Sequence, residues 1–421
     1  MRADAVLEYR KEQARRESFG GRRVFHYSIP AIQETGDGRE ENGAEIDSDK
    51  ISLNGDELLV SKLNPRKGCV LISRRRDLPV VCSTEFVPLK ARGCELRFAY
   101  YLYASQPVRD LISSTVQSVT RSHQRANPAD IVKAWLAFPP DAEQAAIASF
   151  LDRETAKIDA LVAKKERLIE LLQEKRTALI SHAVTQGLNP DAPMKDSGIP
   201  WLGRIPAHWE VTALKRNWEV IDCKHRTVPF VLEGVPVASI GEVQSFNLDL
   251  SNSNLTTRDE YLALIEGGRR PKRGDVIYSR NATVGAAAYV NTDAVFCMGQ
   301  DVCLIRSPSN DQRFLVYQLR SPVVMRQLDS LALGVTFKRI NVEQIKNLTL
   351  CCPTAAEQED IAAYLDAEIA KLDALTAKMR TAIERLQEYR TALISAAVTG
   401  QIDVRQVSDL PNAAQPETSP G

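Results

Sequence analysis

The chain has 421 residues, 44% of them hydrophobic, and its 54 basic side chains balance 54 acidic ones. This length allows two or three domains with separate cores. No apolar run approaches the roughly 18 residues that a membrane span needs, no signal segment opens the chain, and the eight cysteines form no CxxC pair. We therefore expect a soluble, cytoplasmic protein with reduced cysteines and no metal site.

The first 138 residues predict a mixed lobe of strands and helices. Residues 1–20 are charged and look helical, and Gly20-Gly21 ends that pattern. From Val24 onward, short runs rich in Val, Ile, Tyr and Ser are bounded by Asn, Gly and Pro, which is typical of strands. Residues 98–112 then predict a helix, and residues 131–138 predict a last strand.

A long repeat begins after this lobe. Residues 139–185 return as residues 353–399, with 30 of 47 positions identical. No Gly or Pro occurs between residues 141 and 185 or between residues 354 and 399. Each copy therefore predicts a single helix of up to ~65 Å.

Each predicted helix carries one apolar stripe, with apolar residues spaced alternately by four and three positions. A helix of this length with one apolar face needs a partner, and the nearest partner is the other copy. We expect the two copies to pack as an antiparallel coiled coil with an approximate twofold axis. The stripe residues expected between the helices are Leu151, Ile158, Leu161, Leu168, Leu365, Leu372, Leu375 and Leu386.

A second lobe follows a linker rich in Pro, Asn and Gly at residues 187–198. The elements of the first lobe recur there in the same order: GDELLVSK at Gly55 corresponds to GDVIYSR at Gly274, and SVTRSHQR at Ser118 corresponds to GVTFKRIN at Gly334. The expected fold is α+β, with two mixed α/β lobes separated by two long helices and a pseudo-twofold internal repeat. The predicted parts are a first lobe at 1–138, a first helix at 139–186, a second lobe at 187–352, a second helix at 353–403 and a disordered tail at 404–421.

Three sequence strings carry a family resemblance. They are KDSGIPWLGRIPAHWEV at residues 195–211, the PxxxEQxxIAxxLD run that opens both long helices, and the RTALISxAVT run that ends them. With the duplicated layout, these strings resemble the specificity subunits of type I restriction-modification systems over most of the chain.

The resemblance implies a non-catalytic DNA-recognition subunit. Two target-recognition domains, separated by two conserved helices, would each read one half of a split DNA site, and the complex would methylate adenine or cut DNA through partner subunits. The implied partners are double-stranded DNA, two methyltransferase subunits and two restriction subunits, with no membrane. The resemblance implies no cofactor in this chain, with AdoMet on the methyltransferase partner and ATP and Mg on the restriction partner.

The beginning of the chain departs from this family. Such subunits usually carry a first copy of the WLGxIPxHWEV segment near the N-terminus, whereas this sequence opens with MRADAVLEYRKEQARRES. Because the strand pattern from Val24 onward is intact, we expect a first lobe with a trimmed edge.

Two polar, basic loops recur at equivalent positions in the two lobes, which favours DNA contact over ordinary solvated turns. Reading bases in the major groove needs paired donors and acceptors on a rigid support. The candidates are Ser61, Lys62, Asn64, Arg66, Lys67, Thr120, Arg121, His123, Gln124 and Arg125 in the first lobe, and Ser279, Arg280, Asn281, Thr283, Thr336, Lys338 and Arg339 in the second. The basic runs at residues 74–76 and 269–273 are candidates for phosphate contacts.

Two other functions stay open from the sequence. One is a diverged stand-alone DNA methyltransferase or nuclease, although the sequence has no glycine-rich AdoMet loop, no NPPY-like motif, no phosphate loop and no paired-carboxylate nuclease cluster. The other is a coiled-coil scaffold without a DNA role. AdoMet binding by the isolated chain would favour an enzyme, whereas sequence-specific DNA retention that needs a methyltransferase partner would favour a recognition subunit.

Overall fold

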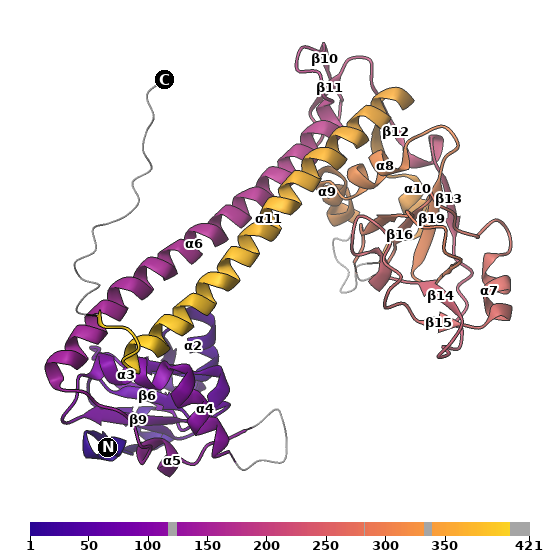
Figure 1. Ribbon diagram of the computed structural model, residues 1–421. Helices are drawn as coiled ribbons and strands as arrows, with labels where there is room; N and C mark the ends of the chain where they lie inside the picture. Colours follow the sequence, from indigo (N-terminus) through magenta and orange to yellow (C-terminus); the bar gives the residue numbers. More distant parts are fainter. Residues whose placement is uncertain (117–123, 282, 332–338, 405–421) are drawn as a thin grey trace, which may run out of the picture. The chain divides into compact units, whose positions relative to one another are not determined.

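The computed structural model shown in Figure 1 describes four stretches of the chain, residues 1–116, 124–281, 283–331 and 339–404. The chain divides into two compact units, Met1–Glu166 with Arg380–Gly421 and Arg167–Met379. Each unit holds one lobe and one end of each long helix. No helix in the described part of the chain is both long and apolar enough to cross a membrane.

Two sheets form the first lobe. One is antiparallel with the order β1-β9-β6-β7, and the other has the order β2-β5-β8-β3-β4 with β3 and β8 parallel. Along β6, Leu58 and Val60 pack toward the helices of the lobe while Leu59 packs toward the other sheet, as the two-residue period of a strand requires. The strands are β1 Leu7–Tyr9, β2 Gln13–Ala14, β3 Arg23–Tyr27, β4 Arg39–Asn42, β5 Lys50–Leu53, β6 Leu58–Ser61, β7 Val70–Ile72, β8 Val80–Ser83 and β9 Phe86–Ala91.

Three helices of the first lobe, at residues 96–104, 106–114 and 128–132, pack with the sheet that contains β6. The predicted helix at residues 98–112 is two helices, which separate at Ser105 because Pro107 fits only the first turn of a new helix. The helices are α1 Arg16–Phe19, α2 Ile29–Thr35, α3 Leu96–Ala104, α4 Gln106–Ser114 and α5 Pro128–Val132.

Two local predictions for the first lobe are wrong. The charged N-terminal stretch is not one helix: it holds strands β1 and β2 before the short helix α1, because Leu7 is buried and its strand pairs with β9. The predicted strand at residues 131–138 begins instead as the end of α5 and reaches the N-terminus through a bridge between Arg2 and Trp135. Tertiary pairing overrides local propensity in both places.

The second lobe repeats this topology. Its antiparallel sheet has the order β13-β19-β16-β17, and β14 pairs in parallel with β18 as β3 does with β8. The strands are β10 Met194–Asp196, β11 Arg204–Pro206, β12 Glu210–Ala213, β13 Glu219–Asp222, β14 Val235–Ala238, β15 Leu255–Thr256, β16 Val276–Ser279, β17 Ala287–Tyr289, β18 Cys297–Met298, β19 Val302–Arg306 and β20 Thr349–Cys352. The helices are α7 Arg258–Ile265, α8 Gln312–Leu319, α9 Pro322–Leu331 and α10 Val342–Lys346.

The two long helices are confirmed. They are α6 Asp141–Gln186 and α11 Ala355–Val398, and their ends pack antiparallel within each unit. In the first unit Arg390 Nε donates to Asp159 Oδ1 at 2.9 Å, and in the second unit Arg176 Nη1 donates to Asp373 Oδ1 at 2.6 Å. These four residues are the same Asp and Arg positions of the repeat, so the contact recurs with its partners exchanged.

The apolar face between the helices differs in part from the predicted stripe. Leu151, Ile158, Leu365 and Leu372 are buried and Leu386 is half-buried, as expected. The prediction is wrong for three others, because Leu161, Leu168 and Leu375 are 47%, 39% and 38% exposed.

Neighbouring positions replace the exposed leucines in the contact between the helices. On α6 these are Val162, Lys165 and Ile169, all half-buried. Each predicted leucine lies one residue before a position that faces the partner helix. Because an α-helix has 3.6 residues per turn, the leucine points about 100° away from that position. The apolar stripe of a single helix is therefore too wide to predict which of its residues face the partner helix.

A buried glutamine attaches each lobe to the start of its long helix. Gln144 donates from Nε2 to the carbonyl of Pro139 at 2.7 Å and accepts from the amide of Glu95 at 2.9 Å. Gln358 makes the matching two bonds in the second unit. These bonds explain the EQ pair of the repeated motif as a structural element.

The aspartate that ends the same motif makes a second attachment. Asp152 accepts from the hydroxyl of Tyr101 and from Arg97, both at 2.8 Å. Asp366 repeats both bonds with a Tyr and an Arg of α8. The PxxxEQxxIAxxLD run therefore fixes each lobe to its helix.

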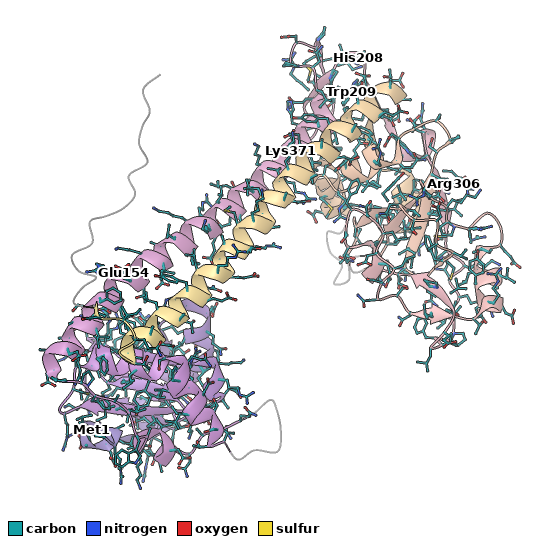
Figure 2. The ribbon with its side chains drawn as sticks, in the orientation of Figure 1. Met1, Glu154, His208, Trp209, Arg306 and Lys371 are labelled. Carbon is teal, nitrogen blue, oxygen red and sulfur yellow. The ribbon has the colours of Figure 1, made fainter. Side chains whose placement is uncertain are left out.

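The WLGRIPAHWEV segment closes the junction in the second unit (Figure 2). Trp209 is 1% exposed and packs with the start of α11, and its Nε1 donates to Glu357 at 3.3 Å. His208 lies 2.7 Å from the same carboxylate. This segment serves packing at the helix ends.

Replacing Gln358 by Leu should destabilise the second unit by more than about 2 kcal/mol. The change leaves the amide of Asp311 and the carbonyl of Pro353 buried without their partner, and each such group costs about 1–3 kcal/mol. Urea unfolding of the full chain measures the effect. Gln387→Leu, at an exposed position of the same helix, is the matched control and should change the free energy of unfolding by less than about 0.5 kcal/mol; equal effects would contradict the structural role of Gln358.

Candidate nucleic-acid interface

The structure brings the two candidate loops of the first lobe together. The amide of Asn64 donates to the carbonyl of Gln124 at 2.7 Å, and the amide of Ala126 donates to the carbonyl of Lys62 at 2.9 Å. Gln124 also donates its amide to the side chain of Asn64 at 3.2 Å. Residues that lie 60 positions apart in the sequence thus form one local surface at the end of β6.

The described parts of the corresponding loops meet in the same way in the second lobe. The amide of Ile340 donates to the carbonyl of Arg280 at 2.9 Å, and Asn281 forms a bridge with Arg339. A third loop supports each pair, since Lys62 donates its amide to the carbonyl of Glu85 at 2.9 Å and Arg280 donates to that of Asp301 at 2.8 Å. The same backbone framework therefore presents both candidate surfaces.

The candidate side chains differ in how far they reach solvent. The exposed ones are Arg66, Lys67, Arg125, Thr283 and Arg339. The half-buried ones are Lys62, Asn64, Gln124 and Asn281. Thr120, Arg121, His123, Thr336 and Lys338 lie outside the described residues.

Three candidates are buried, so the prediction that their side chains contact bases directly is wrong for this structure. Ser61 is 4% exposed and Ser279 is 0% exposed. The Ser61 hydroxyl donates to the carbonyl of Leu63 at 3.1 Å and the Ser279 hydroxyl to that of Asn281 at 3.0 Å. The two serines shape the turn after the strand, and the third buried candidate is Arg280.

Arg280 points inward and pairs with Asp222 at the end of β13. Its side chain is 4% exposed, and its Nη1 bonds to Asp222 Oδ1. Burial raises the pKa of the Asp222 carboxyl, but the hydrogen bond from His225 and the charge of Arg280 outweigh it and hold that pKa below its ordinary value. Asp222 is therefore a carboxylate that neutralises the buried guanidinium, and Arg280 is part of the support of the surface.

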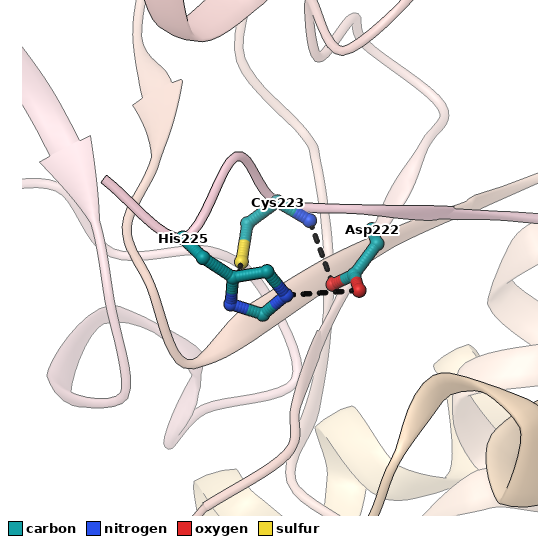
Figure 3. A group of neighbouring side chains, drawn as sticks. All are labelled: Asp222, Cys223 and His225. Atoms are coloured by element: carbon teal, nitrogen blue, oxygen red, sulfur yellow. Dashed lines mark hydrogen bonds and ion pairs between the residues drawn. The ribbon is translucent and has the colours of Figure 1, made fainter.

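Asp222 is also the first member of a small cluster with Cys223 and His225 (Figure 3). His225 Nε2 lies 3.0 Å from Asp222 Oδ2, and the Cys223 thiol lies 3.6 Å from His225 Nδ1. These residue types can hold a metal ion. However, Arg280 already occupies one oxygen of Asp222, and the Cys223 thiol donates to the carbonyl of Gln300 at 2.9 Å.

The chemistry of this cluster favours hydrogen bonding over metal coordination. Burial raises the pKa of the Cys223 thiol above its ordinary value, whereas a metal ligand must be a thiolate. A divalent ion would also meet the fixed positive charge of Arg280. The cluster therefore acts as a network that orients His225.

The sequence reasoning missed the turn at residues 223–227. Its order, Cys-Lys-His-Arg-Thr directly after a predicted strand, combines basic and hydrogen-bonding side chains. That pattern was a usable signal. It was overlooked because it has no counterpart of similar sequence in the first lobe.

The predicted phosphate-binding runs are partly engaged within their own lobes. Arg76 pairs with Asp37 at 2.9 Å and stacks over Phe25, and Arg273 pairs with Asp293 at 2.7 Å. Arg269 donates to the backbone carbonyl of Asp222 at 2.8 Å. These contacts leave phosphate binding by the two runs as a prediction.

Comparison with known proteins finds one matching domain and a sequence relative. Residues 233–385 match the type I restriction modification DNA specificity domain. The chain is 22% identical over 331 residues to the type I restriction enzyme EcoBI specificity subunit of Escherichia coli. This alignment covers 76% of the chain and 69% of the Escherichia coli protein.

Two solved structures share the fold. One is a chain from a study of complex assembly and conformational transition of the type I R-M system, with a TM-score of 0.68, 18% identity and coverage of 96% of this chain and 97% of that chain. The other is the HsdS subunit from Thermoanaerobacter tengcongensis, with a TM-score of 0.52, 16% identity and coverage of 96% of each chain. Together with the matched domain and the sequence relative, they show that the chain is similar to specificity subunits of type I restriction-modification systems.

Proposed function

We propose that the chain is the DNA sequence-recognition subunit of a type I restriction-modification complex. It binds a bipartite target in double-stranded DNA, and each lobe reads one block. Partner subunits then methylate adenine in that target or restrict the DNA.

One observation carries this proposal. Two polar loops, far apart in the sequence, meet on the same backbone framework at the same place in both lobes. Each framework presents an exposed basic side chain at the equivalent position, Arg125 in the first lobe and Arg339 in the second, and Arg125 is held there by Glu85 at 3.0 Å. Two similar readers on one chain fit a target that consists of two separated blocks.

The chain acts without catalytic chemistry of its own. Two methyltransferase subunits, which bind AdoMet, and two restriction subunits, which use ATP and Mg, supply the reactions. The PxxxEQxxIAxxLD run at the start of each long helix fixes a lobe, and the helices bind the methyltransferase subunits. A stand-alone methyltransferase or nuclease is not favoured, since the matched domain is a DNA specificity domain and the sequence relative is a specificity subunit.

Mapping of methylated adenines in the host tests the proposal. With the gene intact, methylation should fall on one bipartite sequence, and deletion of the gene should abolish it. The purified chain should bind DNA of that sequence specifically only when the methyltransferase subunits are present. AdoMet binding by the isolated chain would refute the non-catalytic role.

The two lobes should read their blocks independently. Arg339→Ala should relax the block read by the second lobe, and Arg125→Ala should relax the other. Each lost base contact should reduce discrimination by about 5- to 150-fold, which corresponds to about 1–3 kcal/mol. Methylation mapping of each variant measures this, and a simultaneous change in both blocks would contradict the assignment of one lobe to one block.

A further inference from the structure

We propose that His225 determines specificity in the second lobe, as a base-reading side chain that Asp222 and Arg280 hold in place. The inference rests on the proposed function and adds a third segment to the DNA-reading surface of this lobe. The expected contact is between the imidazole and the exocyclic amino group of an adenine or a cytosine in the major groove.

The turn that carries His225 is bonded to the first candidate loop, which in turn is bonded to the second. Asp222, at its start, pairs with Arg280 in the first loop, and the Arg280 carbonyl accepts from Ile340 in the second loop at 2.9 Å. At its end, Thr227 accepts from Gln300, next to the loop residue that supports Arg280. The turn therefore belongs to the same local surface as the predicted loops.

The orientation of the imidazole follows from its contact with Asp222. An ionised carboxylate can only accept, so His225 Nε2 carries the hydrogen and donates to Asp222 Oδ2 at 3.0 Å. With its hydrogen on Nε2, the ring has its acceptor at Nδ1. Nδ1 lies 3.6 Å from the Cys223 thiol, whose hydrogen is directed to the carbonyl of Gln300 at 2.9 Å, so the thiol leaves the acceptor without a donated hydrogen. Because the His225 side chain is 50% exposed, its ring can meet a donor from outside the protein.

Arg280 gives this arrangement its charge balance. A buried guanidinium is costly without a partner, and Asp222 is that partner. The Asp222 carboxylate thereby lies between the buried Arg280 guanidinium and the exposed His225 imidazole. A carboxylate that accepts a hydrogen bond from a functional histidine commonly fixes the orientation of its ring in this way. Arg280 occupies the position that Lys62 has in the first lobe. The pairing with Asp222 explains why Arg280 is buried whereas Lys62 is half-buried.

The backbone at His225 supplies an independent observation. Its φ is +49°, in the left-handed region that is uncommon for residues other than Gly, although His, Asn and Asp adopt it more often than other side chains. Among the described non-glycine residues, positive φ occurs also at Asn64, with +50°, in the candidate loop of the first lobe. Such conformations concentrate at functional sites, where the surrounding structure holds them.

Ion pairs on both sides of His225 hold the turn rigid. Lys224 pairs with Glu266, and Arg226 pairs with Glu260 at 2.7 Å. Arg269 also bonds the backbone carbonyl of Asp222 at 2.8 Å. The flanking basic side chains are thus engaged within the lobe, while the imidazole lies at the tip of a fixed turn.

His225→Asn in the chain co-expressed with its methyltransferase subunits tests the proposal. Asn tolerates the left-handed backbone but has no imidazole. One base position in the block read by the second lobe should lose about 5- to 150-fold of its discrimination, with the other block unchanged. His225→Ala should relax the same position, and its thermal unfolding shows whether the lobe stays folded.

His208→Asn is the matched control. His208 is 51% exposed and also contacts a carboxylate, Glu357, but it lies at the helix junction of the same unit. It should leave the methylation pattern unchanged. If His208→Asn relaxes the same base as His225→Asn, the proposal is overturned.

The positioning role of Asp222 and Arg280 has its own readout. Asp222→Asn should relax the same base position as His225→Asn, and the double variant should be no worse than the single ones, because both remove one contact. Arg280→Lys, which keeps a positive charge, should restore part of the discrimination that Arg280→Gln loses. Loss of stability without relaxation at that base would overturn the positioning role.

The outcomes separate this inference from the proposed function. A wild-type chain that directs no bipartite methylation would refute the proposed function. A wild-type chain that directs it, with His225→Asn leaving the pattern unchanged, would overturn the inference about His225 alone.

Discussion

Replacing Ile158 by Asp should destabilise the first unit by about 3–5 kcal/mol, the cost of an unpaired charge at a buried position. Ile158 is 5% exposed and packs in one cluster with Leu151, Leu393 and Ile394, where α6 meets α11. The helix backbone offers no spare donor to a carboxylate at this depth. Urea unfolding followed by circular dichroism measures the loss.

Leu161→Asp is the matched control for this prediction. Leu161 lies three residues further along α6 and is 47% exposed, so a charge there remains hydrated. It should change the free energy of unfolding by less than about 1 kcal/mol. Equal destabilisation by both variants would mean that the helices pack through the stripe expected from sequence, rather than through Ile158 and Val162.

Lengthening both long helices by four residues should lengthen the gap between the two blocks of the target. If the lobes read two blocks of one duplex, the blocks should be centred near one helical turn apart, ~34–36 Å, and helix length should set that distance. Four residues add about 6 Å, close to two base pairs at ~3.4 Å each. The blocks themselves should stay unchanged, and methylation mapping reads both quantities.

The contact between Arg176 and Asp373 gives the place for the insertion. In that register, Leu171–Glu174 lie opposite Leu375–Lys378, so a second copy of each segment keeps the two helices matched. The added turn rotates by only about 40° beyond a full circle.

A same-length variant controls for damage to the rod. Replacing the exposed Gln173 and Glu174 by Ala, without insertion, should leave the gap and the blocks unchanged. An active insertion variant with an unaltered gap would contradict the role of the helices as the spacer.

The sequence by itself determined the two long helices and the duplicated order of the lobes. Forty or more residues without Gly or Pro, repeated with 30 of 47 positions identical, leave little choice of local structure. It also predicted that two polar loops recur at equivalent positions in the two lobes, whereas the contact between the two loops of a lobe came from the tertiary structure. The DNA contacts of those residues remain predictions.

Only the tertiary structure decided which side chains face inward. Leu161 and Val162 are both apolar, and the partner helix selects between them. Arg280 is basic and follows a strand, like an exposed base reader, yet Asp222, 58 positions earlier, draws it into the lobe. The short N-terminal strand β1 likewise forms because β9 offers it an edge.

The physical reason is common to these cases. Helix propensity and the absence of breakers act within one segment, so the local sequence contains them. Burial, ion pairing and strand pairing depend on groups that approach from distant positions, and their energies exceed local preferences. For that reason His225, whose orientation requires Asp222 and the buried Arg280 together, became visible only in the folded lobe.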